Sequence, residues 1–140
     1  MGCEGGGVRI LVTGSRTWTD APAIHAALAE ATAGHRGCVI VHGDCPRGAD
    51  RIARDWARSS GHRHEPHPAD WVRWGPAAGH MRNSEMIALG ADVVLAFVDT
   101  CEKPGCPRRG QHFSHGTQDC VKKAAAAGIR VETYPQGALL

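Results

Sequence analysis

Three glycine-containing segments of the sequence carry the groups that a phosphate-binding site needs. They are Gly14-Ser15-Arg16, Gly43-Asp44 with Arg47-Gly48, and His115-Gly116-Thr117. Backbone N–H groups at such turns, with the positive end of a following helix, bind phosphate oxygens, and arginines supply the opposite charge. A tight turn after a strand also needs glycine, so each glycine alone indicates only a turn. The fingerprint G-x-G-x-x-G is absent after the first apolar run, which argues against an ordinary NAD(P) dehydrogenase.

The second of these segments is the densest in functional groups. Residues 43–50, GDCPRGAD, hold two glycines, one arginine and two carboxylates. Asp44 suits a hydrogen bond to a ribose hydroxyl or a role in ordering the loop. Asp50 lies near the expected start of a helix, where a helix cap, a first-turn charge and a ligand contact all fit its position.

Two tryptophans and an Arg-Asn pair are further candidates for ligand contacts. Trp71 or Trp74 suits stacking on a base, with Asp70 accepting a hydrogen bond from an exocyclic amine or a ribose hydroxyl. In the alternative interpretation the tryptophans only pack this loop onto the domain. Arg82 and Asn83 suit a phosphate contact, and the alternative for them is a solvated helical face.

The segment 99–116 is the most unusual part of the chain, because loops of this length are uncommon in a compact domain. Cysteines and histidines gather in and just after it, at Cys101, Cys106, His112, His115 and Cys120. A structural zinc ion bound by the cysteines and one histidine would hold such a loop, although the spacing matches no standard zinc-finger pattern. The alternative is a loop with reduced cysteines that closes over the ligand, with His115 facing it. Its basic residues also suit contacts with phosphates or nucleic acid.

Alternating strand and helix patterns must position these groups. Apolar, β-branched runs predict strands over 8–13, 38–42 and 92–98, and weaker patterns predict strands over 62–67 and 130–134. Capping and stop signals predict helices over 20–34, 49–60, 79–89 and 117–127. This order predicts an α/β domain with a Rossmann-like, doubly wound, mainly parallel five-stranded sheet and helices on both faces. The two proline-marked strands are expected at the edges, and ligands at the carboxyl ends of the strands.

Length and composition limit the assignment. With 140 residues the chain is expected to form one domain, over 8–135, between a flexible tail at 1–7 and a second tail at 136–140. A formal charge of +2 is too small to predict binding to nucleic acid or an anionic membrane. No membrane-spanning run or signal-peptide pattern is found, so we expect a cytoplasmic protein with reduced or metal-bound cysteines.

Several segments taken together resemble a known family. They are VTGSRTWTD (12–20), HGDCPRGADRIARDWA (42–57), RNSEM (82–86), ADVVLAF (91–97), and HGT (115–117) followed by AGIRV (127–131). As a set they resemble the YspA/YpsA-related SLOG family of small bacterial and phage proteins, over about residues 8–135. That family shares a superfamily with the DprA single-strand DNA-binding proteins and the LOG-type nucleoside-monophosphate phosphoribohydrolases. The resemblance implies a Rossmann-like fold that binds a nucleotide-derived ligand.

The LOG-type branch carries a catalytic arginine and a catalytic glutamate, in the motifs M-x-x-R-K and P-G-G-x-G-T-x-x-E. Arg82 lies at the position similar to that arginine, with Asn83 where that branch has lysine. Gly116 and Thr117 match the second motif, but its first two glycines are missing and Cys120 stands at the glutamate position. Cleavage of an N-glycosidic bond needs a carboxylate to stabilise the sugar cation or to activate water, so this replacement weighs against hydrolysis.

Three functions remain, in order of preference. The first is binding of a nucleotide-derived small molecule, such as a nucleoside phosphate or an ADP-ribose derivative, at the carboxyl rim of the sheet. The second is a LOG-like phosphoribohydrolase, with Arg82 holding the substrate and Asp44 or Glu85 supplying the carboxylate. The third is single-stranded nucleic-acid binding, which the near-neutral charge disfavours. Association into a homodimer is an expectation drawn from the family's relatives.

Overall fold

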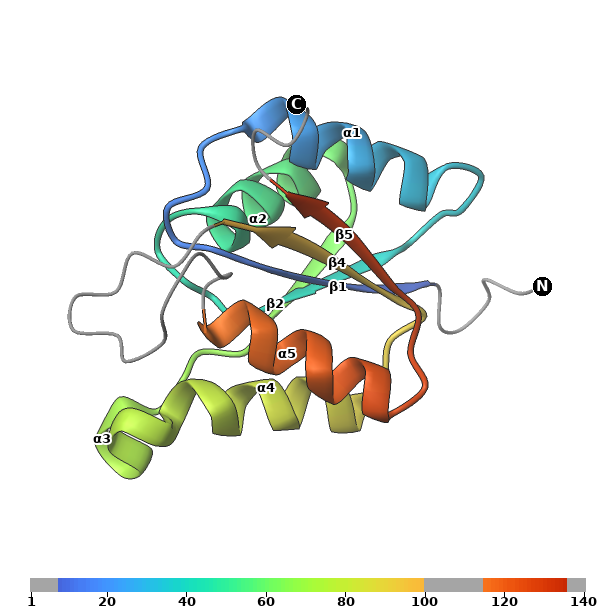
Figure 1. Ribbon diagram of the computed structural model, residues 1–140. Coiled ribbons are helices and arrows are strands. Elements are labelled where there is room, and N and C mark those ends of the chain that lie inside the picture. The colour runs from blue at the N-terminus through green and yellow to red at the C-terminus, as the bar shows by residue number, and fades with distance from the viewer. Residues whose placement is uncertain (1–7, 100–114, 136–140) are drawn as a thin grey trace.

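The structure is a computed structural model in which residues 8–99 and 115–135 are described. Five strands form one sheet in the order β3-β2-β1-β4-β5 (Figure 1). Every pairing in it is parallel, so the predicted parallel α/β sheet is confirmed. The strands are β1 (Arg9–Gly14), β2 (Val39–His42), β3 (Arg63–Pro66), β4 (Val93–Val98) and β5 (Val131–Pro135).

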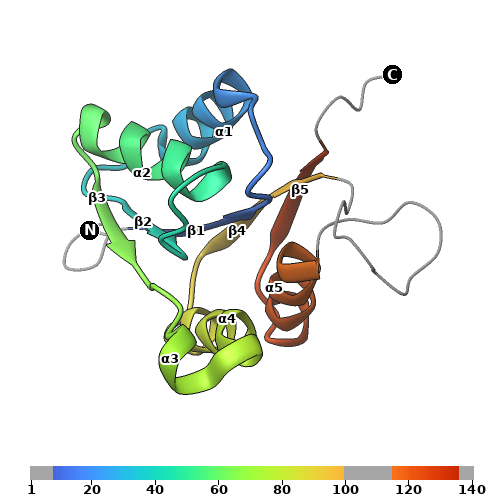
Figure 2. The same cartoon turned by 90° about the vertical axis from the view of Figure 1, so that its left-hand side faces the viewer.

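Helices cover both faces of this sheet. Figures 1 and 2 show α1 and α2 on one face and α4 and α5 on the other. In the described part of the chain no helix is both long enough and apolar enough to cross a membrane. The helices are α1 (Ala21–Thr32), α2 (Ala49–Ser60), α3 (Trp71–Trp74), α4 (Ala78–Leu89) and α5 (His115–Ala126), with a 3-10 turn, η1 (Gly75–Ala77), between α3 and α4.

The apolar side chains of the central strands explain this layering. All six residues of β4 are buried, and successive side chains face opposite helix layers. Leu95 packs in a cluster with Ile24 of α1 and Ala53 of α2, whereas Val94 packs in a second cluster with Met86 of α4. A strand that is apolar on both faces fits only a sheet that helices cover on both sides.

The strand order fixes where a ligand can bind. The polar strands β3 and β5 lie at the edges of the sheet, as their prolines predict. β1 pairs with β2 on one side and with β4 on the other, so the strand order reverses between β1 and β4. In open parallel sheets ligands bind outside the carboxyl ends of the strands at this reversal.

The segment after β3 differs from the loop expected there, because residues 71–77 form α3 and η1. Asp70 caps α3, and its Oδ1 accepts a hydrogen bond from the Arg73 backbone N–H at 3.0 Å. Figure 1 shows α3 projecting beyond the N-terminal end of α4. A short helix therefore forms a wall on the carboxyl side of the sheet.

Candidate functional site

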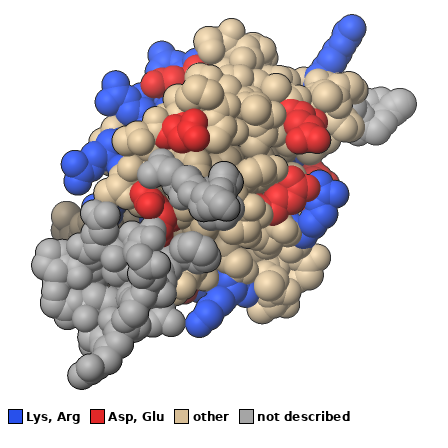
Figure 3. Space-filling view, turned by 45° about the horizontal axis from the view of Figure 1, so that its top comes forward, with Lys and Arg blue, Asp and Glu red and all other residues tan. Residues whose placement is uncertain are grey.

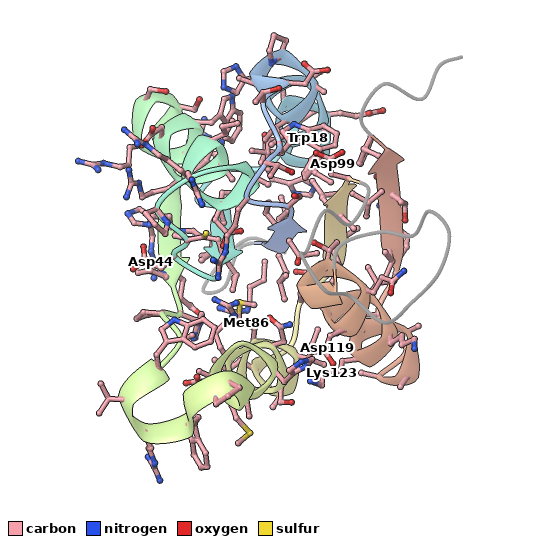
Figure 4. The ribbon with its side chains drawn as sticks, turned by 60° about the vertical axis from the view of Figure 1, so that its left-hand side comes forward. Trp18, Asp44, Met86, Asp99, Asp119 and Lys123 are labelled. Atoms are coloured by element: carbon pink, nitrogen blue, oxygen red, sulfur yellow. The ribbon has the colours of Figure 1, made fainter. Side chains whose placement is uncertain are left out.

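A cavity of about 760 Å³ opens at the carboxyl ends of the strands. The loops after β1 and β2, the segment around α3, α4 and the first turn of α5 line it. In Figure 4, Met86 of α4 lies between Asp44 on the β2 side and Asp119 on α5. The structure therefore brings most of the predicted ligand contacts around one space. Those in its lining are Gly14, Ser15, Arg16, Gly43, Asp44, Arg47, Asp50, Trp71, Arg82, Asn83, Gly116 and Thr117.

Two glycines bring the loops after β1 and β2 into backbone contact. Gly48 has a φ of 78°, and a Cβ atom on it would collide with the carbonyl oxygen of Ser15. The N–H of Ala49 donates to that same oxygen at 3.2 Å. A Cβ atom on Gly14 would collide with the side chain of Ala49 and the carbonyl oxygen of Phe97. Gly48 therefore shapes the cavity wall from behind instead of lining it.

The loop after β1 is ordered by its own hydroxyl groups. The hydroxyls of Ser15 and Thr17 lie 2.6 Å apart, and the Thr17 hydroxyl donates to Oδ2 of Asp99 at 2.8 Å. The exposed side chain of Arg16 extends from this loop, and that of Arg47 from the loop after β2. Both line the cavity, so a fixed backbone presents two solvated cations at its mouth.

Asp50 lies in the first turn of α2 and lines the cavity from a buried position, with 8% of its surface exposed. Its Oδ2 accepts a hydrogen bond from the backbone N–H of Cys45 at 3.2 Å. Burial raises the pKa of this carboxyl to about 6, against the lowering effects of that N–H group and of the positive charge of Arg82. The N-cap of α2 is Gly48, so Asp50 is a first-turn carboxyl and not the helix cap.

Asp44 and His42 form a second polar pair, of which the sequence interpretation missed the histidine. Asp44 is exposed, and among the described residues it is the only one other than glycine with a positive φ, 58°. Its N–H donates to Nδ1 of His42 at 3.0 Å, so the ring proton of His42 lies on Nε2, 3.0 Å from Nδ1 of His64. Burial and the nearby His64 lower the pKa of His42 to about 4. The signal was a polar residue ending the apolar run 38–42.

Arg82 and Asn83 connect three of the segments that line the cavity. Nη1 of Arg82 donates to the carbonyl oxygen of Gly43 at 2.6 Å, and its Nε donates to Oδ1 of Asn83 at 3.0 Å. Nδ2 of the buried Asn83 donates to the carbonyl oxygen of Gly116 at 3.2 Å and to Oδ2 of Asp119 at 3.0 Å. This chain of hydrogen bonds sets the loop after β2 and the start of α5 against α4, so the pair is not a solvated helical face.

Asp119 belongs to an ionic network between α4 and α5. Its carboxylate lies 2.7 Å from Nζ of Lys123 and 3.0 Å from Nδ1 of His80, and Figure 4 shows Asp119 and Lys123 side by side on α5. Partial burial raises the pKa of Asp119, but hydrogen bonds from Lys123, Asn83 and His80 together lower it below its usual value. These partners occupy the carboxylate, and Asp119 does not belong to the described lining of the cavity.

Glu85 lies apart from the other candidate catalytic residues. Its side chain is 62% exposed, and Oε2 lies 3.9 Å from Nδ1 of His67. Among the described residues that line the cavity are Arg82, Asp44 and Asp50, but not Glu85. Among the described residues, the carboxylates in the cavity lining are therefore Asp44 of the loop after β2 and Asp50 at the start of α2.

The two tryptophans of α3 differ in position. Trp71 lines the cavity and is 51% exposed. Trp74 is 40% exposed and stacks under the guanidinium of Arg73, 4.7 Å from the ring centroid. Exposure of both rings does not fit the alternative in which they pack a loop onto the domain. Asp70 is occupied as the cap of α3.

The start of α5 supplies the last wall of the cavity. Gly116 and Thr117 line it, and Thr117 is buried. Among the described residues, no other heavy atom lies within 4 Å of a Cβ atom added to Gly116. The backbone of His115 begins α5, and its side chain lies outside what the structure describes.

The predicted zinc ligands are only partly within the described residues, because Cys101, Cys106 and His112 lie outside them. Cys120 is fully buried and packs in the core cluster with Leu11. Burial raises the pKa of its thiol to about 11, which disfavours the thiolate that binds zinc. Over residues 8–99 and 115–135 no group of three or more His, Cys, Asp or Glu side chains is arranged to hold a metal ion.

Comparison with known proteins links this cavity to a family. Residues 8–74, which include the loops after β1 and β2, match the family described as YspA, cpYpsA-related SLOG. The chain is also 44% identical over 134 residues to the Gene 61 protein of Mycobacterium phage D29, an alignment that covers 90% of this chain and 95% of that relative. No solved structure is significantly similar to the chain.

Proposed function

The chain belongs to the YspA, cpYpsA-related SLOG family, and on that premise we propose that it binds a nucleotide-derived small molecule, such as a nucleoside phosphate or an ADP-ribose derivative. The observation that carries the proposal is the set of three arginines, Arg16, Arg47 and Arg82, in the lining of one cavity at the strand reversal. A volume of about 760 Å³ lies within the range of about 300–1,000 Å³ that is typical of small-molecule sites.

The two ends of the cavity suit the two ends of a nucleotide. No described residue crowds Gly116 at the start of α5, and the positive end of this 12-residue helix favours a phosphate. The exposed side chains of Arg16 and Arg47 supply countercharge in the cavity lining. Trp71 offers a half-exposed ring on which a base can stack, an interaction worth about 1–3 kcal/mol.

Binding is favoured over N-glycosidic hydrolysis by the positions of the carboxylates. At the place of the LOG-type glutamate the chain has Cys120, whose thiol lies in the core. Asp119, one residue earlier, is paired with Lys123, and Glu85 lies outside the described lining of the cavity. Phosphoribohydrolase activity is therefore the second function and would rely on Asp44 or Asp50.

Single-stranded nucleic-acid binding has less support. On the face that Figure 3 shows, Asp and Glu side chains lie among Lys and Arg side chains, without a continuous basic surface over the described residues. Nucleic-acid binding depends on basic patches that track the phosphate backbone. The exposed cations at the cavity mouth suit one or a few phosphates.

Calorimetric titration with AMP, GMP, ADP and ADP-ribose tests the proposal. We expect measurable affinity for at least one of them and a loss of about tenfold to a hundredfold for Arg16→Ala and Arg47→Ala, since a charge-assisted contact contributes about 1.5–3 kcal/mol. Arg51→Ala is the matched control, because Arg51 lies on α2 and pairs with Asp55. Absence of binding, or equal losses in all three variants, refutes the proposal. Chromatography of the same mixtures for free base tests hydrolysis.

Zinc, a homodimer and a cytoplasmic location stay predictions from the sequence. Among the described residues, Cys38, Cys45 and Cys120 form no disulfide with one another. The burial of Cys120 leaves the cysteines and histidines before it as the better zinc ligands.

A further inference from the structure

Asp50 is a group that the proposed function leaves without a role. It is buried in the cavity lining, and within the described residues no ion pair involves its carboxylate. Glu65 and Asp119 are both more exposed, yet each has a cationic partner, Arg9 at 3.0 Å and Lys123 at 2.7 Å. Burial of an unpaired carboxylate is unfavourable, so its presence at this position needs a cause.

The fold alone does not supply that cause. The backbone N–H of Cys45 donates to the Asp50 carboxylate, and an asparagine oxygen would accept such a bond without a charge to desolvate. The positive end of α2 favours a carboxylate in the first turn, but an exposed one would gain from it as well. A carboxylate differs from the amide in being an ionised group that only accepts, with about four lone-pair positions.

We propose that Asp50 is the specificity-determining residue of the cavity, where it accepts a hydrogen bond from a hydroxyl or amine group of the ligand while the phosphates lie toward Arg16 and Arg47. This inference rests on the proposed function. Hydrogen bonds to an ionised acceptor are about twice as strong as neutral ones. A buried acceptor also rejects an analogue that lacks the donor, because the acceptor is then left unpaired.

The surroundings of Asp50 predict how pH affects this contact. The charged and titratable groups that face it are Arg82 of α4, Asp44 of the preceding loop and the thiol of Cys120 on α5. Cys120 stays neutral over the physiological range, because burial raises the pKa of its thiol to about 11. With a pKa of about 6, Asp50 is ionised at pH 7.5 and protonated at pH 5. The affinity for the ligand should therefore fall as the pH is lowered from 7.5 to 5. A phosphate also titrates near pH 6, so the difference between wild type and Asp50→Asn is the informative quantity.

The experiment is a cycle of protein and ligand variants at pH 7.5. The probes are AMP, 2′-deoxy-AMP, 3′-deoxy-AMP and IMP, which remove one ribose hydroxyl or the exocyclic amine at a time. We expect Asp50→Asn to weaken the binding of AMP by about tenfold to a hundredfold. The affinity for the analogue that lacks the hydrogen-bond donor recognised by Asp50 should stay nearly unchanged. The analogue affected identifies a ribose or a base contact. Asp55→Asn is the control, since Asp55 is exposed on the same helix.

The outcomes separate this inference from the proposed function. If wild type binds none of these probes and none of GMP, ADP and ADP-ribose, the proposed function fails and the inference falls with it; if it binds only one of the latter, the deoxy analogues of that nucleotide replace those of AMP in the cycle. If wild type binds AMP but Asp50→Asn weakens all probes equally or not at all, the inference is overturned while the proposed function stands. Thermal unfolding confirms that the variant is folded, and the pH profile of wild-type affinity is a readout that needs no variant. If wild-type affinity falls at low pH no more than protonation of the ligand phosphate explains, the inference is also overturned.

Discussion

Gly48 gives a sharp test of how the two loops form the cavity wall. Its backbone, with φ 78° and ψ −149°, lies in a region that is open almost only to glycine, and an alanine there costs about 1–3 kcal/mol in strain. The added Cβ would also collide with the backbone of Ser15 and Arg16. Relief of that collision requires the loops to separate, which breaks the hydrogen bond that Ser15 O accepts from the N–H of Ala49 at 3.2 Å.

The expected magnitude follows from these terms. The lost hydrogen bond contributes about 1 kcal/mol, so together with the backbone strain Gly48→Ala should lower the free energy of unfolding by about 2–4 kcal/mol. Gly61→Ala is the comparison, because Gly61 also has a positive φ, 80°, but no heavy atom of the described residues lies within 4 Å of an added Cβ. Left-handed strain costs about 1–2 kcal/mol there, offset by about 0.4–1 kcal/mol from the stiffer unfolded chain.

Urea unfolding followed by tryptophan fluorescence measures both variants. We expect the Gly48 variant to unfold at a clearly lower urea concentration with the same slope, and to lose ligand affinity because the cavity wall has moved. The Gly61 variant should keep its affinity. Equal destabilisation of the two variants would refute the close backbone contact, since φ alone would then account for both.

Four further predictions follow from the site. Asp50→Asn should raise the free energy of unfolding by about 2–3 kcal/mol at pH 7.5 and by almost nothing at pH 4, because the buried carboxylate, with its pKa raised to about 6, destabilises the fold only where it is ionised. Thermal melts at both pH values measure this gain in stability, and a gain that does not vary with pH contradicts the prediction. Asn83→Ala should cost about 2–4 kcal/mol in urea unfolding, because buried hydrogen bonds to Gly116 and Asp119 are lost; a loss under about 0.5 kcal/mol would contradict the network. Trp71→Ala should weaken the binding of AMP about fivefold or more in calorimetry, while Trp74→Ala should not, since of the two rings only that of Trp71 lines the cavity. Equal losses of affinity in the two variants would exclude stacking on Trp71. Elemental analysis of protein purified without added metal should find about one zinc per chain, unchanged in Cys120→Ala because that thiol lies in the core; a ratio well below one removes the zinc site.

The sheet could be predicted from the sequence because its signals are local. β4 is an uninterrupted apolar run and proved to be buried at every position. Pro66 and Pro135 mark strands that tolerate a missing N–H, and both strands lie at the edges. α3 was missed because four residues carry too little periodicity to indicate a helix, although Asp70 supplied a capping signal.

The burial of each site residue could not be predicted from the sequence, because burial depends on contacts between segments that are distant in the sequence. Asp44 and Asp50 belong to one short segment, yet the first is exposed and the second is buried. The difference arises where Gly48 packs against Ser15, a contact between two separate loops. His42 was missed for the same reason: its role depends on the path of the loop that follows it, which places the Asp44 N–H on its ring.

The network around Asn83 explains why an Arg-Asn pair is suited to this cavity. A lysine at position 83, as in the LOG-type motif, would have no oxygen to accept from Nε of Arg82 and would face Lys123 across Asp119. The Asn83 amide provides both an acceptor and a donor: its oxygen accepts a hydrogen bond from Arg82, and its nitrogen donates to Gly116 and Asp119. Arg82 is thereby held against the Gly43 carbonyl oxygen, with the start of α5 fixed beside it. The walls are thus ordered by the protein's own hydrogen bonds, so less of the binding free energy is spent on ordering them, and the charge of Arg16 and Arg47 and the acceptor of Asp50 can act directly on the ligand.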